Sequence, residues 1–201
     1  MGPNGAGKTT LFRIITGLET AGTGTVDILG GALGYLPQDP ILPQRATATQ
    51  FLEYVGWLQK VPREELSSAV SGALSQVGLT EKADQPVRAL SGGMQRRLGI
   101  AQALVHGPGV VLLDEPTVGL DPLQRASLRE TIARLGSEAT VLVSTHLVED
   151  VRGMADRVIV LSSGTVTFDG TVEQLEALED PTALGDTPLE RAITAMMGTE
   201  G

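Results

Sequence analysis

The sequence contains no cysteine. This absence excludes disulfide bonds and thiolate metal sites, and it suits a protein of the reducing cytosol. Long apolar runs are also missing: even a clear one such as VVLL covers only residues 110–113, whereas a membrane-spanning helix needs roughly 18 apolar residues. The residues after Met1 do not show the basic-then-apolar pattern of a leader peptide. If this protein serves a membrane, we expect it to act from outside the bilayer.

Basic residues are few and dispersed. The chain has 15 Lys and Arg against 24 Asp and Glu, which gives a net charge of −9 and a pI near 4.7. The densest basic spot is QRR at residues 95–97, and two arginines on a helix are usually just solvated. An acidic chain without a basic block lacks the field that attracts phosphate backbones. We therefore expect no nucleic-acid partner.

The length of 201 residues suits one domain, or a core with one inserted subdomain. In the second half, apolar segments typical of buried strands alternate with helical patterns, which predicts an α/β fold with a parallel sheet covered on both faces. The predicted strands of this half cover residues 109–115, 140–144 and 157–162, and the predicted helices follow Ser91, Pro122 and Leu147. Before them, helical patterns over residues 47–58 and 62–77 indicate a helical insert, and residues 22–31 suggest a short strand between glycines.

Residues Gly2 to Thr9 fit the pattern G-x-x-x-x-G-K-[ST] at every fixed position. In such a loop the glycines let backbone N–H groups curl around phosphates, and the helix that follows points its positive end at them. Lys8 would neutralise the β- and γ-phosphates, and the Thr9 hydroxyl would ligate Mg²⁺. The alternative is a chance Gly-rich turn, which the amphipathic spacing of Leu11, Ile14, Ile15 and Leu18 makes weaker.

Two further segments contain residues of the types that phosphate transfer requires. The run GVVLLDEP ends an apolar strand in Asp114 and Glu115, at the sheet edge where α/β sites lie. There Asp114 would hold Mg²⁺ and Glu115 would act as general base toward water. In LSGGMQRR, Ser91 is placed to cap a helix, and Gly92 and Gly93 expose N–H groups at its start. The plainer alternatives are a strand that merely stops at a polar pair and an ordinary helix N-cap.

Taken in order, these motifs resemble those of the nucleotide-binding domains of the ATP-binding cassette (ABC) family, and the resemblance covers nearly the whole chain. The ordered motifs are GPNGAGKTT, the glutamine loop at Gln38, LSGGMQRR, VVLLDEP, GLD at residues 119–121 and STH ending at His146.

The resemblance implies a role for each motif residue. The ATP-binding residues would be Asn4, Gly5, Ala6, Gly7, Lys8, Thr9, Thr10, Ser91, Gly92 and Gly93. Thr9, Gln38 and Asp114 would hold Mg²⁺, and Glu115, Gln38 and His146 would be catalytic. In the family two domains pair head to tail, so that Ser91 and Gly93 would contact the ATP of the partner domain, with Asp121 at the interface.

The same resemblance implies an ATPase subunit of an ABC transporter, with ATP and Mg²⁺ as cofactors. Its partners would be a second ABC domain, in a homodimer or heterodimer, and transmembrane permease subunits, and it would lie in the cytoplasm, peripheral on the inner face of the cell membrane. Within one ABC domain, residues 40–88 would form the helical (signature) subdomain, residues 1–39 and 89–180 the P-loop core, and residues 181–201 a C-terminal tail. The stretch YLPQDPILPQRATATQFLEYVGWL and the tail LERAITAMMG resemble drug-efflux ATPases, which favours export.

The chain departs from the family pattern at its start. Relatives have some tens of residues before the phosphate loop, including a strand and an aromatic residue that stacks on adenine, so no adenine-stacking residue can be named. We expect an N-terminally truncated chain whose loop has lost its anchor on one side. The short connection at residues 31–35 predicts a reduced antiparallel β subdomain, formed by residues 24–30 and part of 32–36.

Two alternatives to a transporter subunit stay open. A soluble ABC-superfamily ATPase of ribosomes or chromosomes would have two cassettes or a long coiled coil, whereas this chain has one cassette and 52 residues between Gln38 and Ser91. The second alternative is an inactive truncated fragment or a regulatory dimerisation module.

Half of the six aromatic residues lie within one predicted helix: Phe51, Tyr54 and Trp57. They would pack in the core of the insert or form a socket for a membrane subunit.

Overall fold

The computed structural model describes residues 1–28 and 31–197. The chain divides into two compact units, Met1–Gly24 with Ser144–Gly201, and Thr25–Val143. The phosphate loop and His146 belong to the first unit, which we call the loop unit. Gln38, LSGGMQRR and the Asp114–Glu115 pair belong to the second, which we call the strand–insert unit.

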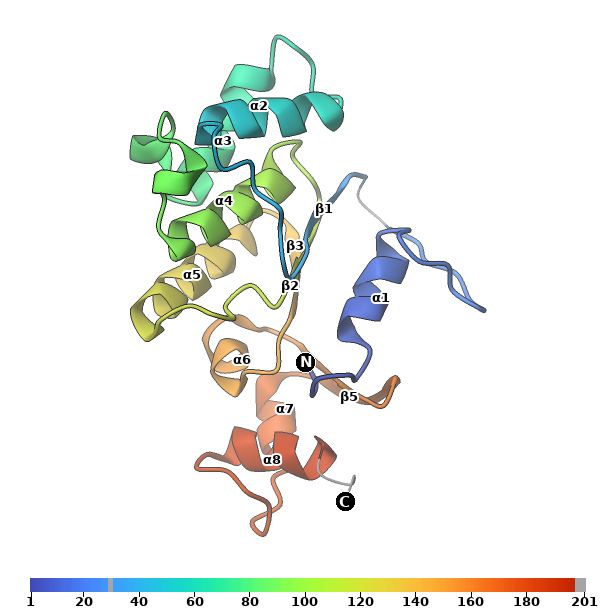
Figure 1. The fold of residues 1–201 in the computed structure, drawn as a ribbon. Helices are drawn as coiled ribbons and strands as arrows, with labels where there is room; N and C mark the ends of the chain where they lie inside the picture. The colour runs from blue at the N-terminus through green and yellow to red at the C-terminus, as the bar shows by residue number, and fades with distance from the viewer. Residues whose placement is uncertain (29–30, 198–201) are drawn as a thin grey trace. The chain divides into compact units, whose positions relative to one another are not determined.

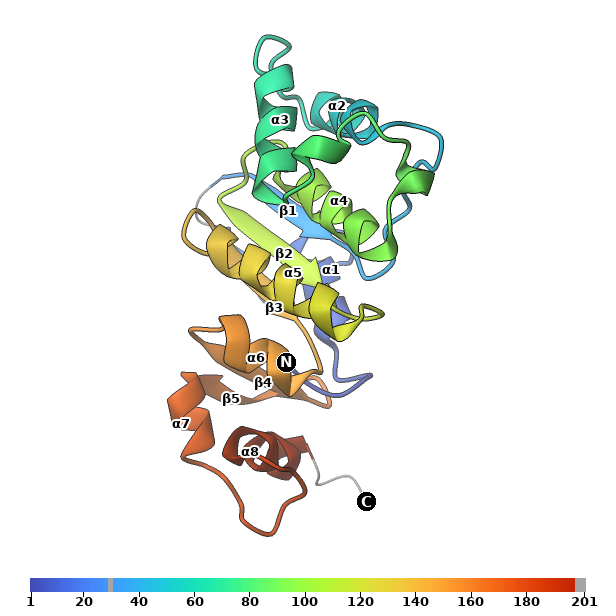
Figure 2. The same cartoon turned by 90° about the vertical axis from the view of Figure 1, so that its left-hand side faces the viewer.

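The sheet of the strand–insert unit has the order β1-β2-β3, formed by Leu33–Leu36, Val110–Asp114 and Thr140–Ser144. β1 and β2 are parallel, and their register pairs Leu33 with Val110 and Leu36 with Leu113. Helices α4 (Gly92–Leu104) and α5 (Pro122–Leu135) lie on the same face of this sheet (Figure 1, Figure 2). Two glycines let α4 approach β1 closely: a Cβ on Gly34 would meet the Ala103 carbonyl oxygen at 2.1 Å, and one on Gly99 would meet Leu36 at 2.8 Å.

The helical insert contains α2 (Ala48–Leu58), α3 (Leu66–Gln76) and two 3₁₀ turns at Thr80–Lys82 and Val87–Ala89. α2 begins with a capping box in which Thr47 and Gln50 each accept from the other's backbone N–H. The second helix begins at Leu66 rather than at Pro62, because residues 63–65 form a turn in which Glu65 N donates to Pro62 O.

The loop unit begins with the phosphate loop and α1 (Lys8–Ile15), followed after the strand–insert unit by α6 (Val148–Met154). β4 (Val158–Ser162) and β5 (Thr165–Gly170) then form an antiparallel pair, and α7 (Val172–Glu176) and α8 (Pro188–Met197) complete the unit. Its core is a cluster of buried residues: Val151, Val158, Val160, Leu175, Leu189, Ala192 and Ile193.

The α/β fold with a parallel sheet, helices and a small antiparallel sheet is confirmed. The predicted location of the antiparallel pairing was wrong: β4 and β5 form it, and residues 33–36 instead pair in parallel with β2. The strand predicted within residues 22–31 is absent from the described positions 22–28, and residues 29–30 lie outside the described chain. Residues 22–24 include two glycines and a bend. None of the described strands pairs with residues 22–28, so Thr25, Val26 and Ile28 have no ladder to join.

The amphipathic helix after Lys8 is confirmed, but its buried side chain is Phe12. Leu11 is exposed, and Leu18 lies beyond the end of the helix. Across the described residues, no helix combines the length and apolarity needed to cross a bilayer.

Candidate functional site

The phosphate loop has the backbone that its glycines predict. Gly5 and Gly7 have φ values of 81° and 97°, in the left-handed region that residues with a Cβ disfavour. Gly7 precedes α1, and its carbonyl accepts from Leu11 N at 2.9 Å. The first residues of α1 are therefore oriented so that their backbone N–H groups point to the inside of the loop, as an anion site requires.

Lys8 lies across this loop. Its Nζ donates to the carbonyl oxygens of Gly2 at 2.8 Å and Pro3 at 3.0 Å. Gly2 itself must lack a side chain, because a Cβ there would lie 2.2 Å from the Leu161 carbonyl oxygen. The ammonium group and the glycine backbone thus share one compact turn, in which a phosphate can replace carbonyl oxygens as the partner of Lys8.

The loop is anchored on two sides within its unit. The Met1 carbonyl accepts from Leu161 N at 2.8 Å, the Ala6 carbonyl accepts from Gly164 N at 3.1 Å, and Gly2 N donates to Thr145 O at 3.3 Å. The expected loss of an anchor is therefore wrong for these residues: within the loop unit, backbone bonds to β4, to the turn after it and to Thr145 hold the loop.

His146 follows Thr145 directly and is exposed. The turn that presents it is held by the Thr145 hydroxyl, which donates to Asp150 Oδ2 at 2.9 Å and accepts from Leu147 N at 3.0 Å. Because Gly2 also bonds to Thr145, the loop unit places the phosphate loop and His146 on adjoining backbone.

In the strand–insert unit, Asp114 ends β2 and Glu115 follows it, and both are buried, with 0% and 5% of their surface exposed. Glu115 has a φ of 47°, a left-handed backbone that is uncommon for a residue with a Cβ. Gln38 is exposed in the bend after β1, two residues beyond Leu36. The unit thus brings Gln38, Asp114 and Glu115 to one edge of the sheet, while their roles stay predictions.

Arg96 and Arg97 are not solvated arginines, contrary to the sequence-based expectation. Arg96 donates through Nη1 to Gln38 O at 2.5 Å and through Nε to Pro116 O at 2.8 Å. Its Nη2 donates to Asp114 O at 3.2 Å and to Glu115 O. Burial lowers the pKa of Arg96, and the carboxylates of Asp39, Asp114 and Glu115 oppose that shift.

Arg97 has a different set of partners on the other side of α4. Its Nη1 donates to Val77 O at 2.8 Å, and its Nη2 donates to Ser127 Oγ at 2.6 Å. These bonds join α4 to the end of α3 and to α5. Sequence reasoning missed both arginines because their acceptors lie 18 or more positions away in the chain.

Ser91 caps α4, as predicted: its Oγ accepts from Met94 N at 3.3 Å. Ser91 and Gly92 are exposed at the helix start, whereas Gly93 is buried against Gln124, whose side-chain atoms would lie 3.0 Å from a Cβ. Asp121 caps α5 through its Oδ1, which accepts from Gln124 N at 2.8 Å. The roles of these residues at a domain interface stay predictions.

The donors present fit a hard cation held with phosphate. Asp114 offers a carboxylate, Gln38 an amide oxygen and Thr9 a hydroxyl, and Mg²⁺ is commonly held by one or two carboxylates together with substrate phosphates. Among the described residues, no three His, Asp or Glu form a cluster that could hold a metal without such a ligand. Thr9 belongs to the loop unit and the other two to the strand–insert unit, so their joint role stays a prediction.

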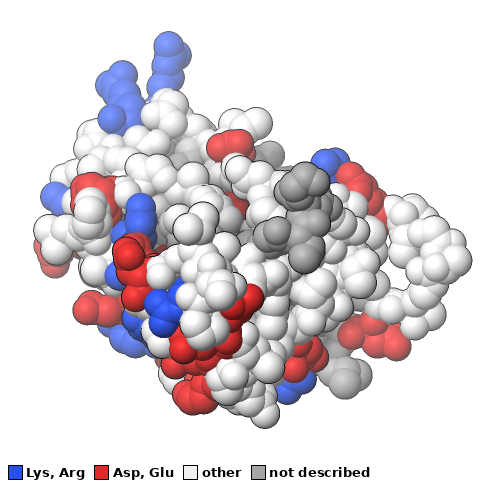
Figure 3. All heavy atoms as spheres, turned by 90° about the horizontal axis from the view of Figure 1, so that it is seen from below, with Lys and Arg blue, Asp and Glu red and all other residues white. Residues whose placement is uncertain are grey.

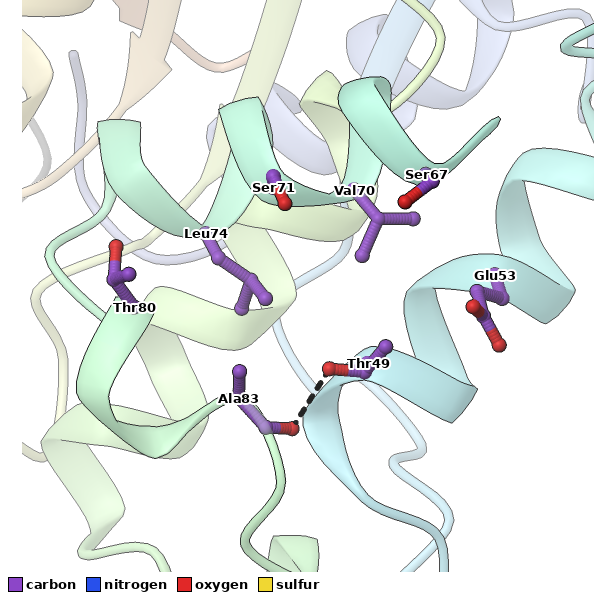
Figure 4. A pocket seen from close by; sticks show the side chains of 8 residues that line it. All are labelled: Thr49, Glu53, Ser67, Val70, Ser71, Leu74, Thr80 and Ala83. Carbon is purple, nitrogen blue, oxygen red and sulfur yellow. Dashed lines mark hydrogen bonds between the residues drawn. The ribbon is translucent and has the colours of Figure 1, made fainter. Parts of the chain in front are cut away.

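A small hollow between α2 and α3 is not the nucleotide site. It has a volume of about 90 Å³ and is lined by Thr49 and Glu53 of α2 and by residues of α3 and the turn after it, where Thr49 Oγ1 donates to Ala83 O (Figure 4). Sites for drug-sized ligands usually measure about 300–1,000 Å³.

On the face drawn in Figure 3, the Lys and Arg side chains of the described residues are scattered among Asp and Glu.

The aromatic residues of α2 are divided between core and surface. Phe51 is buried, but Tyr54 and Trp57 are 59% and 66% exposed, and their rings stack with centroids 6.2 Å apart. Leu58 beside them is also exposed. Of the two interpretations, packing in the core of the insert is wrong for Tyr54 and Trp57 and right for Phe51.

Comparison with known proteins identifies the family. The family model described as ABC transporter matches residues 1–118. The uncharacterized ABC transporter ATP-binding protein YxlF of Bacillus subtilis is 36% identical over 182 residues, which cover 88% of this chain and 62% of that protein. The Nod factor export ATP-binding protein I of Azorhizobium caulinodans is 39% identical over 191 residues, covering 89% of this chain and 60% of that protein.

The chain thus spans about three-fifths of the length of these two relatives. A solved chain, described as an inward-facing conformation of a metal-chelate type ABC transporter, superposes with a TM-score of 0.77 at 23% identity, covering 87% of this chain and 71% of that one. That likeness supports the fold alone. From the family match and the identity to these relatives, the chain belongs to the ABC transporter family, in its ATP-binding proteins.

Proposed function

We propose that this chain binds ATP with Mg²⁺ and hydrolyses it, so as to power transport by separate membrane subunits. The observation that carries the proposal is the buried Asp114–Glu115 pair at the carboxyl end of β2, with Gln38 at the end of the neighbouring strand. Buried carboxylates at this edge of an α/β sheet are typical of sites that hold a cation and activate water.

The residues of the loop unit bind and orient the nucleotide. Backbone N–H groups of residues 4–10 surround the phosphates, and Lys8 turns from Gly2 O and Pro3 O to phosphate oxygens. Mg²⁺, when bound, neutralises charge that develops on the transferred phosphoryl group. Thr9, Asp114 and Gln38 are the residues that would hold it.

Glu115 takes a proton from the attacking water as general base. Gln38 orients that water, and His146 contacts the γ-phosphate. The family's head-to-tail pairing gives the remaining motif residues their role: Ser91, Gly92 and Gly93 contact the ATP of the partner domain, with Asp121 at the interface. The exposure of Ser91 and Gly92 at the start of α4 supports this pairing.

The membrane partner would dock on the insert, close in sequence to Gln38. Three exposed side chains of α2 support this docking site: Tyr54, Trp57 and Leu58. Neighbouring large apolar side chains that are exposed to solvent often mark an interface. A protein with such a partner would lie in the cytoplasm on the inner face of the cell membrane.

Export is the proposed direction of transport. Relatives named for Nod factor export, at 35–39% identity, support this direction.

A thermal melt of the full chain with and without Mg-ATP, followed by a turnover assay, tests the proposal. A ligand at 100 times its dissociation constant stabilises a folded binder by about 2.7 kcal/mol. We expect Mg-ATP to raise the midpoint of the wild type and of Lys82→Ala, whose side chain lies in the insert, but not of Lys8→Ala. A wild type whose midpoint does not move, or that binds ATP and never releases phosphate, would refute the proposal.

A further inference from the structure

The contacts of Arg96 have no counterpart among the motif roles given above. One half-buried guanidinium donates to four main-chain carbonyls: those of Gln38, Asp114, Glu115 and Pro116. Three of these carbonyls are consecutive and belong to the chain that leaves β2, and the fourth belongs to the chain that leaves β1. Arg96 therefore ties together the two segments on which both proposed catalytic residues of this unit lie.

The bond to Glu115 has a specific consequence for the backbone. A residue with a Cβ disfavours the left-handed region, yet Glu115 adopts a φ of 47° there. The orientation of its carbonyl follows from this conformation, and a hydrogen bond from a charged donor is stronger than one from a neutral donor. The guanidinium thus favours the one backbone arrangement of Glu115 that the structure shows.

The shape of the guanidinium explains why an arginine occupies this position. Its planar fork presents five N–H donors in fixed directions, so that a single side chain can serve acceptors on two segments. Arg96 also lies on α4, whose first residues are Gly92 and Gly93 and whose cap is Ser91. The same helix therefore joins the LSGGMQRR motif to the ends of β1 and β2.

We propose that Arg96 is a positioning residue for hydrolysis, which sets the left-handed backbone of Glu115 and fixes the start of the Gln38 loop beside it. This inference rests on the proposed ATPase function. Arg96 does not touch the nucleotide in this scheme: it acts through the placement of Glu115 and Gln38, so its loss should affect turnover rather than the affinity for ATP.

Steady-state hydrolysis by the full chain tests this role with three variants. For Arg96→Gln we expect kcat to fall about 100-fold, since a displacement of about 1 Å at a reacting group has an effect of that size, while KM for ATP stays near the wild-type value. Arg96→Lys should recover part of the loss, because an ammonium group keeps the charge but cannot serve four carbonyls at once.

Arg97→Gln is the matched control, because Arg97 is the next residue on α4 and its partners Val77, Ser127 and Thr131 lie outside the motifs. We expect this variant to lose thermal stability and to keep kcat per folded molecule. Wild-type kcat in Arg96→Gln, or an equal fall of kcat in Arg97→Gln, would overturn the proposal.

Amide hydrogen exchange separates this inference from the proposed function. Val118 N donates to Glu115 O at 3.3 Å, so its protection reports the turn after Glu115. We expect faster exchange at the amides of Glu115, Thr117 and Val118 and at residues 38–39 in Arg96→Gln and not in Arg97→Gln. If the wild type shows no hydrolysis, the proposed function fails, and the exchange rates alone decide whether Arg96 holds the backbone at Glu115. Unchanged exchange rates in Arg96→Gln would show that Arg96 does not hold it.

Discussion

Gln38 and Glu115 lie at matching positions beyond two paired strands. Leu36 of β1 faces Leu113 of β2 in the parallel register, and each of the two proposed catalytic residues follows its leucine by two positions. Because parallel strands end at the same edge of a sheet, this register brings the amide of Gln38 and the carboxylate of Glu115 to one side of the strand–insert unit. A change at either residue should therefore affect the same chemical step.

Replacement of Glu115 by Gln should separate binding from hydrolysis. The amide has nearly the same shape but cannot take a proton, and general base catalysis contributes about 10²–10⁴-fold to a rate. We expect turnover of Glu115→Gln to fall by that order, while the Mg-ATP shift of the melting midpoint persists. Phosphate release and melting curves on the same samples measure both quantities.

Glu64→Gln, in the exposed turn between α2 and α3, makes the same chemical change away from the motifs and should keep full turnover. Near-normal hydrolysis in Glu115→Gln would remove Glu115 from the role of base. An equal loss in Glu64→Gln would point to a general effect of lowering the acidic charge.

Several features could be predicted from the sequence because their causes are local. The left-handed backbone at Gly5 and Gly7, the cap that Ser91 gives to α4 and the burial of β2 all follow from a few adjacent residues. The order of the motifs then indicated the family, which the comparisons show. Short-range chemistry of this kind is what a sequence pattern records.

Other features depend on residues far apart in the chain, and the sequence-based expectations missed them. Arg96 reads as one arginine of a pair on a helix, but its acceptor at Gln38 is 58 positions away. For Trp57 the sequence left open whether the side chain packs in the core of the insert or forms a socket at its surface, and the structure shows that α2 turns it outward. The pattern of residues 22–31 predicts a strand, but a strand also needs a neighbouring strand to pair with. The local sequence does not record whether such a neighbour is present.

The division of the α2 aromatics between core and surface predicts unequal effects of truncation. Phe51 is 7% exposed, and removal of a buried Phe side chain usually lowers stability by about 3–5 kcal/mol. Trp57 is 66% exposed, and surface substitutions usually stay within about 0.5 kcal/mol. We expect Phe51→Ala to lower the free energy of unfolding by several times the effect of Trp57→Ala, as measured by urea denaturation. Equal losses would show that the Tyr54–Trp57 stack supports the insert after all.

His106 predicts that stability declines in mild acid. Its Nε2 bonds to Leu33 O at 3.2 Å, while its buried Nδ1 has no hydrogen-bond partner within the described residues. Burial lowers the pKa of His106 below its usual 6.5, and the bond to Leu33 opposes this in part. His106 therefore takes up a proton more readily in the unfolded chain than in the folded chain. The stability that neutral, buried His106 contributes is fully present above pH 6.5 and is lost as the pH falls from there toward the pKa of the folded state.

Melting midpoints of wild type and His106→Gln across this range check that prediction. Glutamine can donate to Leu33 O through its amide and does not titrate, so the variant should have a flatter profile than the wild type between about pH 7.5 and 5.5. Parallel profiles would show that protonation of His106 is not what destabilises the fold in acid.

Two glycines of the strand–insert unit should respond in opposite directions to alanine. A Cβ on Gly34 would lie 2.1 Å from the backbone oxygen of Ala103, so that β1 and α4 must move apart, and overpacking of this kind destabilises by about 1–3 kcal/mol. Gly72 lies on the exposed side of α3 with no atom within 4 Å of an added Cβ, and alanine is favoured over glycine within a helix by about 0.5–1 kcal/mol.

We therefore expect denaturation midpoints to fall for Gly34→Ala and to rise for Gly72→Ala. Since the shift of β1 against α4 also moves Gln38 relative to Arg96, Gly34→Ala should lower turnover per folded molecule, whereas Gly72→Ala should leave it unchanged. A stable Gly34→Ala with full turnover would mean that the close approach of strand and helix is not needed to place the catalytic edge of the sheet.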